Sequence, residues 1–145
     1  MIGTLTNALP TNAWREVTPI IPNVKIIVVD DDSSIRELIV TALMYCVNRD
    51  VLSFDNGLEA WNYIRGSNGI DIIVSDVDMP EMNGIELLSR IKNHYPDKIC
   101  IIMSGNESNE KSARKTGADA FLTKPFKIGD LFDIVQTYVV DSQRN

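Results

Sequence analysis

The sequence has few of the residues on which several protein classes depend. Two cysteines and one histidine occur among 145 residues. Cys46 and Cys100 lie in apolar surroundings without CxxC spacing, which excludes a disulfide scaffold and argues against a zinc site. We expect both to be reduced core residues, as is typical of an intracellular protein.

Long hydrophobic runs and an excess of positive charge are also absent. No stretch approaches the roughly 18 consecutive apolar residues of a membrane span. The first 23 residues lack the basic start and apolar run of a signal peptide. Fourteen Lys and Arg residues stand against 20 Asp and Glu, for a net charge of −6. A nucleic-acid binder needs a basic face, so we expect no direct nucleic-acid contact. Because a membrane span and a signal peptide are both missing, we expect a cytoplasmic protein with no membrane contact.

The acidic residues that are present are unevenly distributed. Five of the 20 lie in two short clusters, Asp30-Asp31-Asp32 and Asp76-Val77-Asp78, which account for most of the net charge. Carboxylates concentrated in this way suggest a bound cation.

Composition and length indicate one globular domain, because 44% of the residues are hydrophobic and 23% are charged. Residues 1–23 differ from the rest, with three prolines and no sustained period. We expect a loosely ordered N-terminal extension there, and the alternative is a docking arm with Trp14 as its anchor. The domain itself is expected over residues 24–140, followed by a polar C-terminal tail, 141–145.

The domain sequence alternates between short apolar runs and helical patterns. Apolar, β-branched runs begin at Val24, Val51, Ile70, Ile99 and Ala120. Three of them hardly alternate, as expected of strands buried on both faces of a parallel sheet. Apolar residues at helical spacing fill three of the four gaps, at Ile35 to Cys46, Leu58 to Ile64 and Ile85 to Ile91, and a further stripe, Ile128 to Tyr138, follows the last run. The segment Glu107–Thr116 contains one apolar residue, Ala113, and predicts only a short, marginal helix.

This alternation predicts a doubly wound α/β fold, with five parallel strands and helices on both faces. The flavodoxin-like strand order 2-1-3-4-5 is assumed. Asp30, Asp31, Asp76, Ser104 and Lys124 then each lie just past the carboxyl end of a strand, where ligands bind in such sheets. Two unit charges about 4 Å apart repel by roughly 4 kcal/mol at an effective dielectric of about 20. The acid cluster therefore needs a compensating cation, and Mg²⁺ suits carboxylate oxygens and a phosphate. With the lysine and the serine, this indicates phosphoryl transfer.

At this point the sequence resembles a known family, the receiver domain of bacterial two-component response regulators. The matching segments are IIVVDDDSSIREL, IIVSDVDMPEMNGIELL, IIMSG and KTGADAFLTKPF, over about Val24 to Val140. The resemblance implies that Asp76 is the phosphoacceptor, and that Asp30, Asp31, Asp76 and the backbone carbonyl of Asp78 bind Mg²⁺. It also implies a switch formed by Ser104 and Phe121, a lysine, Lys124, that pairs with the phosphoryl group, and a cis bond before Pro125.

The resemblance further implies partners and a limited chemistry. The phosphoryl donor would be a sensor histidine kinase or a phosphotransfer protein. A downstream protein would bind the face formed by residues 104–140, which receivers also use for dimerisation. No output domain is recognisable, so we expect self-phosphorylation and autodephosphorylation only, and not an enzyme with an external product.

Some residues have plainer interpretations or depart from the family pattern. Asp32 falls at a helix start, where capping is favoured over metal binding, and His94 is expected at the surface rather than as a phosphodonor. Phe121 could be simple core, and it lacks the hydroxyl of a tyrosine. Asp78 and Asn106 occupy positions that tune autodephosphorylation in the family, so we hypothesise that the charge of Asp78 alters the phosphoryl lifetime.

Two alternatives from other classes stay open. Haloacid-dehalogenase-like phosphatases also end an apolar strand with DxD, as IIVSDVD does. They place that motif on the first strand, whereas here the acid pair comes first. A degenerate receiver used only as a binding module is the second alternative, although such members typically lose the acceptor or a metal-binding acid, and both are present here.

Overall fold

The computed structural model describes residues 24–47 and 51–144. The proposed N-terminal extension, with its alternative role for Trp14, lies outside these residues, as does the side chain of Cys46. The described chain forms a sheet of five parallel strands in the order β2-β1-β3-β4-β5. The strands are β1 (Lys25–Val29), β2 (Val51–Phe54), β3 (Ile70–Asp76), β4 (Ile99–Ser104) and β5 (Ala120–Thr123). The predicted fold class and strand order are confirmed.

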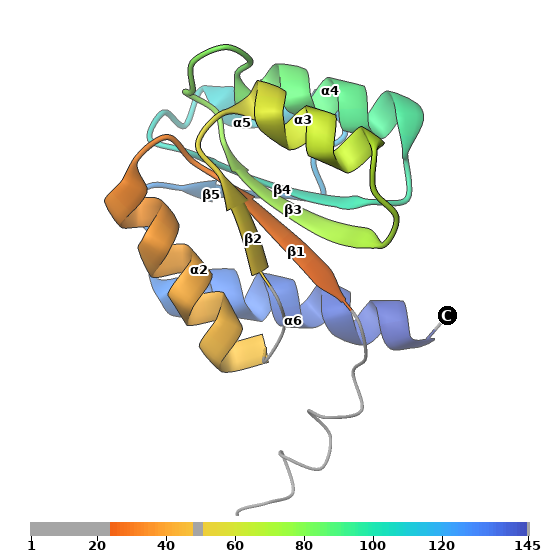
Figure 1. Ribbon diagram of the computed structural model, residues 1–145. Helices are drawn as coiled ribbons and strands as arrows, with labels where there is room; N and C mark the ends of the chain where they lie inside the picture. The colour runs from red at the N-terminus through yellow and green to blue at the C-terminus, as the bar shows by residue number, and fades with distance from the viewer. Residues whose placement is uncertain (1–23, 48–50, 145) are drawn as a thin grey trace, which may run out of the picture.

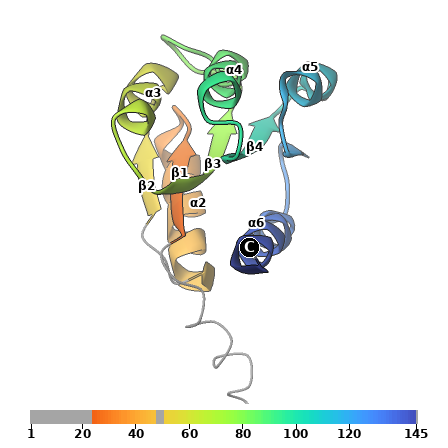
Figure 2. The ribbon, with the colours of Figure 1, turned by 90° about the vertical axis from the view of Figure 1, so that its right-hand side faces the viewer.

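Helices cover both faces of the sheet, as Figure 2 shows. Along the described chain they are α2 (Ser33–Val47), α3 (Gly57–Arg65), α4 (Gly84–His94), α5 (Asn109–Thr116) and α6 (Ile128–Arg144). Helices α2 and α6 lie on one face, and α3, α4 and α5 lie on the other (Figures 1 and 2). None of the described helices is long and apolar enough to cross a membrane.

The continuous apolar runs of the central strands serve two cores at once. Successive side chains of a strand point to opposite faces. Ile26 and Val28 therefore pack into the core beneath α2 and α6, whereas Ile27 and Val29 pack into the core beneath α3, α4 and α5. The edge strands β2 and β5 are less buried, and this explains why only the central runs lack alternation.

Polar side chains cap helices that begin near the carboxyl ends of the strands. Asp32 Oδ1 accepts hydrogen bonds from the backbone N–H groups of Ser34 and Ile35, at 2.9 and 3.2 Å. The predicted capping role of Asp32 is thus confirmed. Asn83 caps α4 in the same way, accepting from the N–H of Glu86 at 2.9 Å. Satisfied N-termini fix where each chain segment turns back from the sheet.

Helices α5 and α6 can be compared with the lengths that the sequence predicts. Helix α5 has eight residues, with Ala113 as its buried side chain, so the predicted short helix is present. Helix α6 continues to Arg144. Residues 141–144, which we expected as a tail, therefore extend the backbone of this helix.

The strand register gathers the ends of the central strands. Val29 pairs with Ser75, Asp76 with Met103, and Ser104 with Thr123. Asp30 and Lys124 follow β1 and β5 directly, so these polar residues share one edge of the sheet. Gly84 packs tightly against this edge, because a Cβ there would lie 2.1 Å from the carbonyl oxygen of Asp76.

Candidate functional site

Three carboxylates meet at the carboxyl edge of the sheet. Asp30 and Asp31 follow β1, and Asp76 ends β3; one oxygen from each lies within 4.8 Å of the others. Asp30 is 0% exposed and Asp76 is 6% exposed, while Asp31 faces solvent. The structure thus brings together the three acids that the sequence analysis singled out.

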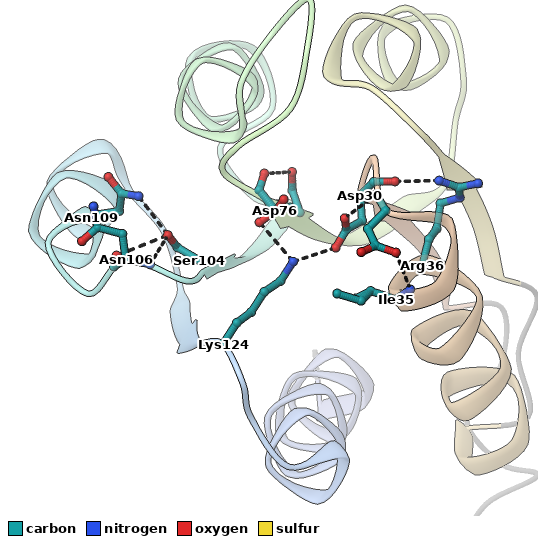
Figure 3. Close-up of polar contacts among 10 residues, drawn as sticks. Asp30, Ile35, Arg36, Asp76, Ser104, Asn106, Asn109 and Lys124 are labelled. Atoms are coloured by element: carbon teal, nitrogen blue, oxygen red, sulfur yellow. Dashed lines mark hydrogen bonds and ion pairs between the residues drawn. The ribbon is translucent and has the colours of Figure 1, made fainter.

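Lys124 places its ammonium group between two of these acids, as Figure 3 shows. Its Nζ lies 2.9 Å from Asp30 Oδ2 and 3.3 Å from Asp76 Oδ1. Burial by itself would lower the pKa of Lys124, but the hydrogen bond to Asp30 and the charges of Asp76 and Asp30 raise it above its ordinary value. Lys124 is therefore a protonated, positively charged group at neutral pH.

The environment of the Asp76 carboxyl group disfavours its charged form. Its pKa is raised above the ordinary value of 3.8, chiefly by burial, and the charge of Asp30 adds to this. The nearby charge of Lys124 acts in the opposite direction without cancelling the effect. A carboxylate that is poorly solvated in this way is a better nucleophile than one in water.

Main-chain and side-chain contacts hold the acids in place. The backbone N–H of Asp32 donates to Asp30 Oδ1 at 2.9 Å, and Arg36 Nη1 donates to the carbonyl oxygen of Asp30 at 2.8 Å. Arg36 was not among the residues predicted from the sequence. Its position six residues after Asp30, on the first turns of α2, could have indicated a contact back to the strand end.

Three carboxylates and one ammonium group leave the cluster with two negative charges. Two of the acids are shielded from solvent, and every candidate ligand atom is an oxygen. This donor set fits a hard divalent cation such as Mg²⁺, which prefers oxygen ligands and needs few carboxylates.

Ser104 belongs to the same edge but faces away from the acids. It ends β4, and its carbonyl oxygen accepts from the backbone N–H of Lys124 at 2.7 Å. Its Oγ is hydrogen-bonded to Asn106 and Asn109 at the start of α5 (Figure 3). The backbone places Ser104 beside the site, whereas its hydroxyl points toward α5.

The other residues from the sequence analysis lie where their chain positions require. Asp78 is exposed in the loop after β3. Phe121 is partly buried and packs against the core beneath α3, α4 and α5. The Lys124–Pro125 peptide bond is cis, as expected.

His94 is exposed near the end of α4, with its ring 5.3 Å from that of Trp61, so its predicted surface location is confirmed. Cys100 is buried and free, and burial raises the pKa of its thiol to about 12.

An apolar groove lies beside Lys124, between α2 and the start of α6. Its volume is about 490 Å³, and its lining includes Ile35, Leu38, Pro125 and Phe126. Leu38 is 60% exposed. A partly exposed apolar surface next to a charged site offers a place where a protein could bind close to the acids.

Comparison with known proteins places this geometry in context. The family model described as the response regulator receiver domain matches residues 26–136. A chemotaxis protein CheY homologue of Campylobacter jejuni is 33% identical over 106 residues, which cover 70% of this chain and 82% of that protein.

Solved structures agree with the sequence comparison. The receiver domain of Francisella response regulator 1452 superposes with a TM-score of 0.76 at 33% identity, covering 83% of this chain and 99% of that one. Response regulator TrrA from Thermotoga maritima, solved in complex with Mg²⁺ and BeF, gives a TM-score of 0.73 at 26% identity. It covers 79% of this chain and 98% of that one.

Proposed function

The chain belongs to the response regulator receiver domain family, and from this premise we propose that it is a phosphoacceptor of a two-component phosphorelay. The carrying observation is the buried carboxyl of Asp76 beside the Lys124 ammonium group, 3.3 Å away. Phosphoryl transfer onto a protein carboxylate needs a nucleophilic oxygen and positive charge for the phosphoryl oxygens, and Asp76 and Lys124 supply both.

In the proposed step, a carboxylate oxygen of Asp76 attacks the phosphorus of a phosphohistidine. The new O–P bond forms as the P–N bond breaks, and the departing imidazole keeps the bonding pair and takes up a proton. Lys124 moves from Asp30 toward the phosphoryl oxygens and offsets their charge. Hydrolysis of the resulting acyl phosphate returns the carboxylate and releases inorganic phosphate.

Mg²⁺ would be held by Asp30, Asp31, Asp76 and the backbone carbonyl of Asp78. When bound, it supplies positive charge for the phosphoryl oxygens. The two negative charges of the cluster and its oxygen-only donor set support this assignment, and TrrA was solved with Mg²⁺ and BeF.

The donor in this proposal is a sensor histidine kinase or a phosphotransfer protein. The apolar groove beside Lys124 supports contact with such a donor, because it flanks the acid cluster.

The signal would leave through the face formed by residues 104–140, by way of Ser104 and Phe121, toward a downstream protein or a second copy of the chain. We place this activity in the cytoplasm, and its catalysis extends only to the protein's own phosphorylation and dephosphorylation.

Intact mass spectrometry after incubation with acetyl phosphate tests this function. We expect one added phosphoryl group that requires Mg²⁺ and is lost in Asp76→Asn. The matched control Asp97→Asn, an exposed acid between α4 and β4, should be labelled as the parent protein is. A folded protein that takes up no phosphoryl group would favour a binding module, and turnover of a phosphate ester would favour a phosphatase.

A further inference from the structure

The hydroxyl of Ser104 already uses its whole hydrogen-bonding capacity. Its Oγ accepts from the backbone N–H of Asn106 at 3.0 Å and from Nδ2 of Asn109 at 2.9 Å. It donates to the carbonyl oxygen of Asn106 at 3.2 Å. A hydroxyl has one proton to donate and two lone pairs, so in this arrangement none is left for a group bound at Asp76.

These three bonds have two different origins. The two bonds to Asn106 are made by the main chain of the loop that directly follows β4. The third comes from Asn109, the first residue of α5. Figure 3 shows both amide side chains and the hydroxyl on the side of Ser104 that faces away from Asp76 and Lys124. The side chain of Asn109 therefore ties the orientation of this hydroxyl to helix α5.

We propose that Asn109 is a positioning residue of the phosphoacceptor site, holding the Ser104 hydroxyl away from Asp76 until a phosphoryl group competes for it. This proposal rests on the function proposed above. For Ser104 to donate to a phosphoryl oxygen, its Oγ must leave the amide of Asn109. The bond between Asn109 and Ser104 thus opposes the phosphorylated arrangement. When that arrangement forms, the bond breaks and the start of α5 is released.

The size of the effect follows from one hydrogen bond. Asn109→Ala removes the donor and leaves a lone pair of a buried hydroxyl without its partner, so the inward orientation becomes more populated. The apparent Kd of a ligand that needs this orientation is inversely proportional to the population of that orientation, so it falls as the population rises. A single neutral hydrogen bond corresponds to roughly a three- to tenfold change in such an equilibrium.

The test is a titration with beryllofluoride, a non-covalent mimic of a phosphoryl group, in saturating Mg²⁺, followed by NMR. Four proteins form a cycle: the parent, Asn109→Ala, Ser104→Ala and the double variant. Asn109→Ala should bind roughly three- to tenfold more tightly than the parent. The same substitution should have no effect in the Ser104→Ala background, because the hydroxyl that it frees is missing there.

The control is Ser112→Ala, at an exposed position of the same helix, which should bind as the parent does. An Asn109→Ala variant that binds equally or more weakly would overturn the proposal, as would an equal gain in both backgrounds, since a structural role in α5 does not depend on Ser104. Absence of beryllofluoride binding by the parent would overturn the proposed function and this proposal with it. Binding by the parent without a gain that depends on Ser104 would overturn the role of Asn109 alone.

Discussion

At the residue scale, Asp76 combines burial with a neighbouring negative charge, and both raise its pKa. The folded protein therefore binds this proton more tightly than the unfolded chain does. Above pH 3.8 the unfolded chain loses the proton first, so the free energy of unfolding falls as the pH rises toward the folded-state pKa. The carboxylate of Asp76 is thus a source of instability at neutral pH.

Replacing this carboxylate by a neutral amide should remove that cost. We expect Asp76→Asn to have a higher Tm than the parent protein at pH 7. The difference should vanish below pH 3.8, where the carboxyl of Asp76 is protonated and neutral in both the folded and the unfolded chain. Thermal unfolding followed by circular dichroism across this pH range measures it. The exposed control Asp97→Asn should stay within about 0.5 kcal/mol of the parent at every pH. A lower Tm for Asp76→Asn at pH 7 would show that the ion pair with Lys124 outweighs burial.

Much of the candidate site was predictable residue by residue, because its members come directly after apolar runs. Asp30, Asp76, Ser104 and Lys124 needed only the rule that parallel strands end at one edge. The orientation of the Ser104 hydroxyl was not predictable. It depends on Asn109, which belongs to a helix with a weak sequence pattern, and on two bonds to the main chain of Asn106 that form only in the folded loop.

At the scale of elements, the junction of β3 and α4 leaves no space for a side chain on Gly84. The backbone N–H of Gly84 donates to the carbonyl oxygen of Val77 at 2.8 Å, which draws the start of α4 onto the end of the strand. An added Cβ would meet the backbone of Asp76 and Val77 at 2.1 and 2.9 Å. Neither group can turn aside as a flexible side chain would.

Gly84→Ala should therefore lower the free energy of unfolding by about 1–3 kcal/mol, the usual cost of overpacking. Gly129, in the first turn of α6, is the matched control, because nothing lies within 4 Å of a Cβ there. Gly129→Ala should leave stability unchanged or raise it by up to about 1 kcal/mol, through better helix propensity. Urea unfolding of the three proteins measures both changes, and an unaltered Gly84→Ala would contradict the close approach.

Among the described helices, α5 has the least apolar anchorage, since Ala113 is its only buried side chain. We expect its amides to exchange hydrogen faster than those of β1, β3 and β4, whose residues lie in the centre of the sheet. Hydrogen exchange followed by mass spectrometry resolves these segments. Protection of α5 equal to that of the central strands would show that this helix does not open readily.

At the scale of the whole molecule, the fold was predictable because several independent signals agree. The central apolar runs, the helical stripes between them and the cap residues all require alternating strands and helices. The strand order had to be assumed, since no residue of a strand encodes which neighbour it pairs with. The extent of α6 was not predicted, because residues 141–144 are polar and carry no apolar period.

In the proposed function, the whole domain presents one carboxylate, Asp76, to a phosphoryl donor. Borohydride reduction of the protein after reaction with acetyl phosphate and Mg²⁺, followed by peptide mass analysis, tests this directly, since it converts a phosphorylated aspartate to homoserine. We expect homoserine at position 76, with Asp30, Asp31 and Asp78 unmodified. Reduction at another of these acids, or a stable phosphate on Ser104 or His94, would contradict it.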